Sequence, residues 1–189
     1  MPKLGQEPVR RAALVAATVD EIGAAGSLDV TVGQIARRAG MSSALAHHYF
    51  GGKAQIFLAA MRHILSEYGD EVRAALRAAP EGARLEAVIA ANFAQSCFRP
   101  EAVSAWLNFY VLAQRDAEAA RLLRIYQRRL RSNLICGLRG RCAAPGAVAE
   151  TLAALIDGVY LRAALDGGGI DGAAEQVMAA AQALMGDHR

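Results

Sequence analysis

Hydroxyl, imidazole and amine groups are concentrated in one short stretch of this 189-residue chain, from Thr31 to Lys53. The stretch also holds a serine pair that begins at Ser42 and a histidine pair, beginning at His47, that Tyr49 follows. Such groups donate hydrogen bonds to phosphate oxygens and to base edges. Adjacent residues of a helix point about 100° apart, so the histidine pair does not suit a single metal ion. These residue types favour contact with a nucleic acid over metal ligation.

Two short helices are predicted within this stretch. Thr31 and Gln34 have the spacing of a capping box, which predicts a helix that starts directly after Thr31. Gly40 can adopt the left-handed conformation that ends a helix. Ser42 then stands where a second N-cap is needed, before a helix that continues to Tyr49. Two helices joined by a tight turn are typical of a helix-turn-helix, whose second helix approaches the base edges.

The motifs Gly40-Met41-Ser42 and His48-Tyr49-Phe50, followed by Lys53, resemble the DNA-binding signature of the TetR family of bacterial regulators. The likeness is strong over residues 9–60, and it implies that Tyr49 and Lys53 contact DNA phosphates. Ala44 stands where the family commonly has glycine, and His47 where it commonly has tyrosine or another polar residue, so base preference does not carry over. For His48 a purely structural role is an equal alternative. The expected DNA contacts are Thr31, Arg37, Ser42, Ser43, Ala44, Leu45, His47, His48, Tyr49 and Lys53.

Segments far from the helix-turn-helix are similar to one TetR subfamily, the choline-responsive repressors of glycine betaine synthesis. These segments are residues 2–11, 106–110, 128–134 and 154–165. The resemblance implies a repressor of the choline-to-glycine-betaine genes that choline or a related effector releases from a palindromic DNA operator. Two alternatives stay open. The chain could be a TetR-type regulator of another small ligand, or a helical small-molecule-binding adaptor without operator specificity.

A choline site would need aromatic faces and negative charge, because a quaternary ammonium makes no hydrogen bonds. Helical spacing puts Trp106 and Tyr110 on one face, and Tyr160 follows Asp157 by three residues. Aromatic residues at such spacing are more often core, and Asp157 could cap a helix or pair with Arg162 instead. The residues of the conceivable cage are Phe93, Trp106, Tyr110, Asp157 and Tyr160.

The fold class expected from composition is all-α. Hydrophobic residues make up 54% of the chain and aromatic residues 6%, and the abundant Ala, Leu, Arg and Glu favour helix over strand. About nine helices are expected, with a three-helix DNA-binding domain over residues 1–55 and a ligand-binding and dimerisation domain over residues 56–189. The last two helices carry long apolar stripes. The TetR resemblance implies that this pair forms a homodimer interface, although the stripes alone would equally suit an internal core.

Other classes of protein lack support in the sequence. No apolar run approaches the roughly 20 residues of a membrane span, and the N-terminal residues lack the apolar core of a signal peptide, so a cytoplasmic protein without membrane contact is expected. The three cysteines form no CxxC pair, which argues against a disulfide framework and a zinc site. The chain has no GxSxG, HExxH or phosphate-binding glycine loop, so neither an enzyme nor a cofactor or metal is expected.

Seven arginines between Arg121 and Arg141 occur with no acidic residue among them. A run of this kind could mark a DNA contact. We favour a long solvated helix face whose arginines pair with residues of a neighbouring helix. The net charge of +3 is too small to identify a nucleic-acid-binding protein by itself.

Overall fold

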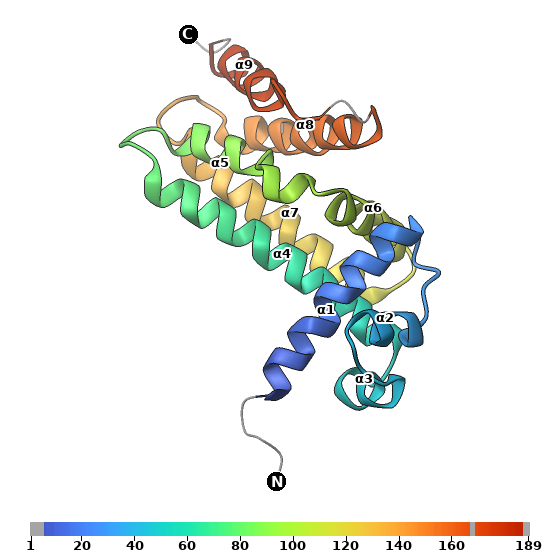
Figure 1. Ribbon diagram of the computed structural model, residues 1–189. Helices are drawn as coiled ribbons and strands as arrows, with labels where there is room; N and C mark the ends of the chain where they lie inside the picture. The colour runs from blue at the N-terminus through green and yellow to red at the C-terminus, as the bar shows by residue number, and fades with distance from the viewer. Residues whose placement is uncertain (1–5, 167–168, 187–189) are drawn as a thin grey trace. The chain divides into compact units, whose positions relative to one another are not determined.

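The computed structural model describes residues 6–166 and 169–186. Within these ranges the chain forms nine α-helices and one short 3-10 helix and contains no strand, which confirms the all-α class. The elements in Figure 1 are α1 (Gln6–Ala25), α2 (Val32–Arg38), α3 (Ser43–Phe50), α4 (Lys53–Ala78), α5 (Arg84–Asn92), η1 (Gln95–Phe98), α6 (Pro100–Ala113), α7 (Ala117–Leu138), α8 (Pro145–Asp166) and α9 (Ala173–Gly186).

Packing divides the chain into two compact units, and each is described by itself. The first unit comprises the described residues up to Ser66 together with Arg99–Leu122. The second comprises Glu67–Phe98 together with the described residues from Leu123 onward. α6 therefore packs with the N-terminal helices, although it follows α5 in the chain. The sequence predicted a boundary after residue 55 between a DNA-binding and a ligand-binding domain. Packing does not test a boundary between functions, so this boundary stays a prediction.

The first unit is built on the apolar faces of α1, α2 and α4. Leu14 and Ile22 of α1, Ile35 of α2 and Ile56 of α4 are all fully buried in one cluster. Burying a side chain of this size contributes about 1.5–3 kcal/mol. α3 adds Ala46, which is also fully buried. Because α2 and α3 have seven and eight residues, this shared core holds them, and their own helix propensity would not.

Local capping signals determine where α2 and α3 begin and end. The Thr31 hydroxyl accepts a hydrogen bond from the backbone N–H of Gln34 at 3.1 Å. In return, the Gln34 side-chain oxygen accepts one from the backbone N–H of Thr31 at 2.7 Å. Gly40 has φ of +67°, and the Ser42 hydroxyl accepts from the Leu45 amide at 3.2 Å. The predicted capping box, turn and second N-cap are confirmed. Each cap is worth about 1 kcal/mol.

α6 lies against the C-terminal half of α1. A β-carbon added at Gly23 would come within 2.6 Å of the Glu101 α-carbon, so only glycine permits this approach. Nearby, the Ser104 hydroxyl donates to the Ile22 carbonyl at 3.4 Å, and the Asn108 amide group donates to the Gly26 carbonyl at 3.2 Å. α6 is thus joined to α1 by close packing and by two side-chain hydrogen bonds.

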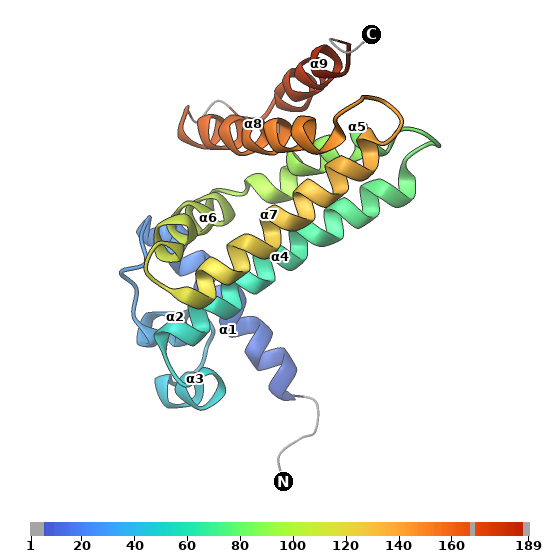
Figure 2. The same cartoon turned by 180° about the vertical axis from the view of Figure 1, so that it is seen from behind.

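The second unit encloses a separate core between α5, α7, α8 and α9 (Figure 2). Leu85, Leu134, Ile156 and Val177, one from each of these helices, are fully buried. Gly137 allows α7 to approach α5, because a β-carbon there would lie 2.9 Å from the Leu85 α-carbon. α9 packs against both α8 and α5.

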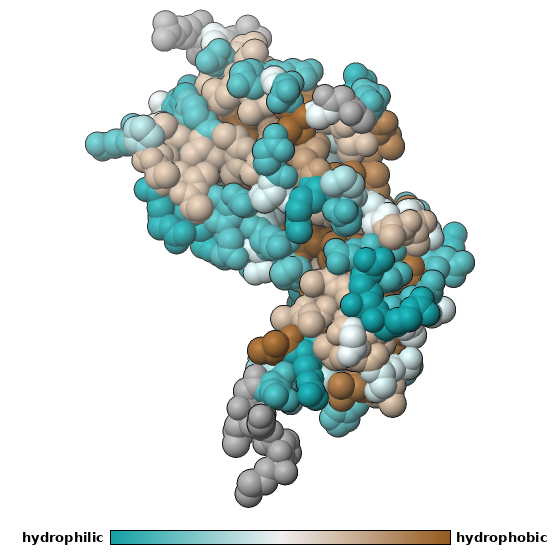
Figure 3. All heavy atoms as spheres, viewed as in Figure 1, coloured by the Kyte–Doolittle hydropathy of each residue, from teal (hydrophilic) through white to brown (hydrophobic). Residues whose placement is uncertain are grey.

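Polar and apolar residues alternate on the face of the protein that Figure 3 presents. Figure 3 shows hydrophilic residues interspersed with pale, weakly apolar ones and small hydrophobic areas on the face it presents. Val9, Val111, Leu161 and Leu165 are the large hydrophobic side chains that stay exposed among the described residues. None of the described helices combines the length and the apolar character that crossing a membrane requires.

Candidate nucleic-acid interface and ligand site

α3 presents a polar face to solvent and an apolar face to the core of its unit. Ser43, Ala44 and His47 are exposed and share one side of the helix, while Ala46 is fully buried on the other side. His48 is exposed as well, and Leu45 is half-buried. In both ribbon views α3 protrudes beside α2 with no other helix over it (Figure 1). The exposed side of α3 is therefore free to approach another molecule.

The two residues expected to contact phosphates lie on either side of the turn that ends α3. Tyr49 is half-buried, and its ring lies 5.5 Å from the His48 ring, centroid to centroid. Gly51, with φ of +76°, turns the chain, and Lys53 then begins α4. The Lys53 ammonium lies 5.4 Å from the centroid of the buried Phe57 ring. Helix N-termini attract anions, so the Lys53 charge and the first amides of α4 favour the same kind of ligand.

The remaining predicted DNA contacts lie at the start and end of α2 and at the cap of α3. Thr31, Arg37 and Ser42 are all exposed. The Thr31 hydroxyl is engaged in its own cap, where it lies 2.7 Å from the Gln34 side-chain oxygen. Arg38, next to Arg37, pairs with Glu21 at 2.6 Å, and that hydrogen bond raises the pKa of Arg38. Arg37 is thus the better candidate of the two arginines for an outside partner.

The five residues of the conceivable cage are divided between the two units. Trp106 and Tyr110 belong to the first unit, where their rings meet edge to face with 5.5 Å between centroids. Phe93, Asp157 and Tyr160 belong to the second unit. Phe93 is buried, and Tyr160 donates a hydrogen bond to the Cys97 carbonyl at 3.2 Å. The Tyr160 ring also packs against Phe98, a residue the sequence did not single out, with 4.5 Å between centroids.

Asp157 is part of a polar and aromatic cluster inside the second unit. The Tyr126 hydroxyl donates to the Asp157 carboxylate at 2.9 Å, and the Tyr126 ring meets the Tyr68 ring edge to face at 5.5 Å. The Tyr68 hydroxyl donates to the Asn92 side chain at 2.9 Å. Burial raises the pKa of Asp157, and the Tyr126 hydrogen bond partly offsets this. Burial also raises the pKa of Tyr68 far above its ordinary value.

Sequence reasoning missed most of this cluster. The sequence suggested that Asp157 could pair with Arg162. In the structure its carboxylate accepts a hydrogen bond from Tyr126 instead. Tyr126 lies 31 residues before Asp157 and sits within the arginine run, where nothing local distinguishes it from a core aromatic. Tyr68 and Asn92, 24 residues apart, are likewise brought together only by packing.

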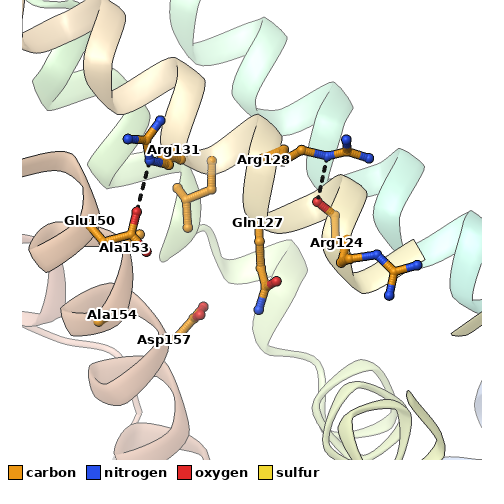
Figure 4. A pocket seen from close by; sticks show the side chains of 9 residues that line it. Arg124, Gln127, Arg128, Arg131, Glu150, Ala153, Ala154 and Asp157 are labelled. Carbon is orange, nitrogen blue, oxygen red and sulfur yellow. Dashed lines mark hydrogen bonds and ion pairs between the residues drawn. The ribbon is translucent and has the colours of Figure 1, made fainter. Parts of the chain in front are cut away.

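A cavity of about 450 Å³ lies between α7 and α8, and the Asp157 carboxylate forms part of its wall (Figure 4). Arg131 of α7 donates to Glu150 of α8 at 2.9 Å, and Arg128 donates to the Arg124 carbonyl at 3.3 Å. Further along, Arg141 pairs with Glu86 of α5 at 2.8 Å. The prediction of a solvated arginine face with partners on a neighbouring helix is confirmed for Arg131, whereas Arg141 lies past the end of α7.

Both the N-terminal and the C-terminal part of the chain match families of known transcriptional regulators. Residues 14–60 match the family of bacterial regulatory proteins named tetR, and residues 80–186 match the C-terminal domain of BetI-type transcriptional repressors. The HTH-type transcriptional regulator BetI of Brucella anthropi is 52% identical over 168 residues, 87% of each chain. BetI of Rhizobium meliloti is also 52% identical, over 87% of this chain and 83% of its own.

Solved structures share the fold. A Pseudomonas aeruginosa PAO1 protein aligns with a TM-score of 0.84 and 25% identity, over 97% of this chain and 93% of its own. A Saccharomonospora viridis protein solved in complex with choline aligns with a TM-score of 0.75 and 21% identity, over 88% of this chain and 92% of its own. The relatives are transcriptional regulators and not enzymes. The chain belongs to the TetR family of bacterial regulatory proteins, and its C-terminal domain is of the BetI type.

Proposed function

We propose that the protein is a transcriptional repressor of the genes that convert choline to glycine betaine, released from its operator by choline or a closely related cation. The observation that carries the proposal is the identity of about half of the aligned residues with BetI regulators over most of the chain. The exposed polar face of α3 supports the DNA-binding part of the proposal. The aromatic cluster around the half-buried Asp157 supports the cationic ligand.

Reading an operator requires two copies of α3, because one helix contacts only a few base pairs and a two-fold dimer reads half-sites about 34 Å apart. We assign the dimer contact to α8 and α9. Ala154, Gly158, Leu161 and Leu165 recur at spacings of four, three and four residues on α8, and all four are exposed in the single chain. Leu165 is 68% exposed. A second copy of the same pair of helices would cover this apolar stripe.

The expected DNA contacts keep the roles given above. Tyr49 and Lys53 anchor phosphates on either side of the turn, and Ser43, Ala44 and His47 face the groove. Phosphate contacts provide most of the affinity and the salt dependence, whereas the groove contacts select the sequence. Exposure of all three groove-facing residues supports this division of roles.

The effector would be held by charge and by ring faces. Asp157 offers a half-buried carboxylate, and a site partly shielded from water attracts a bound cation more strongly than water does. Tyr126, which bonds to Asp157, and Tyr68, whose ring packs on Tyr126, would supply aromatic faces of the kind that bind quaternary ammonium groups. The Saccharomonospora viridis protein, which has a similar fold, was solved in complex with choline. This likeness supports the proposal that the present fold can bind such a ligand.

Two measurements on the purified protein test the proposal. Fluorescence anisotropy with DNA from upstream of choline-oxidation genes should reveal tight binding that scrambled DNA of equal length does not match. Calorimetry should then detect choline but not its neutral isostere, in which carbon replaces the ammonium nitrogen. Absence of any DNA sequence preference would contradict the repressor, and equal binding of the isostere would contradict a cation site.

A pair of variants locates the cation site. Asp157→Asn removes the charge and keeps the shape, and it should weaken choline binding by about tenfold or more, which corresponds to about 1.4 kcal/mol. Asp70→Asn is the matched control, because it makes the same change in an exposed carboxylate that pairs with Arg73 and lies outside the lining of the cavity beside Asp157. Parent-like choline affinity in Asp157→Asn would exclude Asp157 from the site. A protein that binds its operator but ignores choline would be a TetR regulator of another ligand.

A further inference from the structure

The side chain of Arg11 in α1 contacts the end of α3 through both its charge and its flat face. Its Nη1 group donates a hydrogen bond to the backbone carbonyl of Tyr49. The guanidinium carbon lies 4.4 Å from the centroid of the Phe50 ring. Glu7, one turn earlier on α1, lies 4.0 Å from the same nitrogen. Three groups therefore hold one guanidinium, and two of them belong to the last two residues of α3.

The end of α3 needs such support for physical reasons. A helix of eight residues is marginal by itself, and its last carbonyls have no partner within the helix. Arginine near a helix C-terminus bonds to these carbonyls and interacts favourably with the helix dipole. The Gly51 amide already bonds to the His47 carbonyl. Arg11 supplies a partner for the carbonyl two residues later.

We propose that Arg11 is a positioning residue for DNA binding, which fixes the C-terminal end of α3 and with it the Tyr49 side chain without touching DNA itself. The inference rests on the proposed DNA-binding role of α3. It goes beyond that role because Arg11 lies outside the helix-turn-helix. The acceptor on α3 is a backbone carbonyl, so the contact does not depend on which side chain stands at position 49.

Arginine is suited to this position because its planar group donates in its plane and stacks with its face. Lysine keeps the charge, but its ammonium group has no flat face that could stack on the Phe50 ring while it donates to the Tyr49 carbonyl. Arg11→Lys is therefore expected to recover only part of the DNA affinity that Arg11→Gln removes. Arg10→Gln is the matched control, because it removes the same charge from the neighbouring residue, whose side chain bonds to Gln6 on its own helix.

The first experiment measures backbone hydrogen exchange in the full-length protein without DNA. In Arg11→Gln the amides of residues 43–52 should exchange about fivefold or more faster than in the parent, because local opening becomes easier. In Arg10→Gln they should exchange at the parent rate. Equal exchange in the two variants would overturn the proposal. This readout needs no operator, so it decides the role of Arg11 even where the proposed function fails.

The second experiment measures operator binding by anisotropy at several salt concentrations. Arg11→Gln should weaken operator binding about tenfold relative to Arg10→Gln, the effect of removing one charge-assisted hydrogen bond of moderate strength. The two variants should show the same slope of affinity against salt, since neither residue then contacts phosphate. A slope smaller by about 0.9 in Arg11→Gln alone would make Arg11 a direct phosphate ligand and refute the positioning role.

Discussion

Replacing Gly23 by alanine tests the close approach of α1 and α6. The new β-carbon would lie 2.6 Å from the Glu101 α-carbon and 2.7 Å from its β-carbon. Carbon atoms that touch are about 3.5–4.0 Å apart, so the two helices would have to separate by about 1 Å. Overpacking of this kind costs about 1–3 kcal/mol, whereas alanine in a helix gains about 1 kcal/mol over glycine. The expected net result is a decrease of about 0–2 kcal/mol in the free energy of unfolding.

Gly69→Ala is the control for this prediction. A β-carbon at Gly69 would approach only the far end of the flexible Arg73 side chain, at 3.3 Å, so the gain in helix propensity should prevail. Urea unfolding at one fixed protein concentration should separate the two variants by about 1–3 kcal/mol, with Gly69→Ala the more stable. If Gly23→Ala proves as stable as Gly69→Ala, then α6 does not pack on α1 as described.

Three further predictions concern the proposed phosphate contact, the dimer and the half-buried Asp157 carboxylate. Lys53→Ala should weaken binding to operator and to unrelated DNA alike. A salt titration should show a slope of log affinity against log salt concentration that is smaller by about 0.9 for each phosphate the variant no longer neutralises. An unchanged slope would exclude Lys53 as a phosphate ligand. Leu161→Glu should leave the helical circular dichroism intact but produce monomers in analytical ultracentrifugation, whereas dimers of normal affinity would argue against the α8–α9 interface. Burial raises the pKa of Asp157, so the folded state binds the proton of this carboxyl group more tightly than the unfolded chain does. The parent protein should therefore lose stability relative to Asp157→Asn as the pH rises through the acid range. Unfolding measured across that range would contradict the shift if the difference between the two proteins did not change with pH.

The helix-turn-helix could be predicted from the sequence because its signals are local. Thr31 with Gln34, Gly40 and Ser42 each act on residues within four positions of themselves, and the structure has the caps and the turn at those residues. The all-α class followed from composition for a similar reason, since helix propensity belongs to each residue separately.

Contacts between distant residues could not be predicted in this way. The Tyr126 hydroxyl reaches Asp157 across 31 positions, and Arg11 reaches the Tyr49 carbonyl across 38. The second of these has a backbone acceptor, so no side-chain pattern could reveal it. The approach of Gly23 to Glu101 depends equally on tertiary packing, because glycine within a helix has many possible causes. Helical spacing likewise says nothing about tertiary packing, and the cage residues chosen from it lie in two different units.

The central claim is that binding of a quaternary ammonium ion releases this protein from its operator. The most direct test is a titration of choline into the preformed complex of the protein with fluorescent operator DNA, at constant ionic strength. We expect the anisotropy to fall to the value of free DNA with choline and to stay constant with the neutral isostere. An operator complex that persists at saturating choline would contradict the claim.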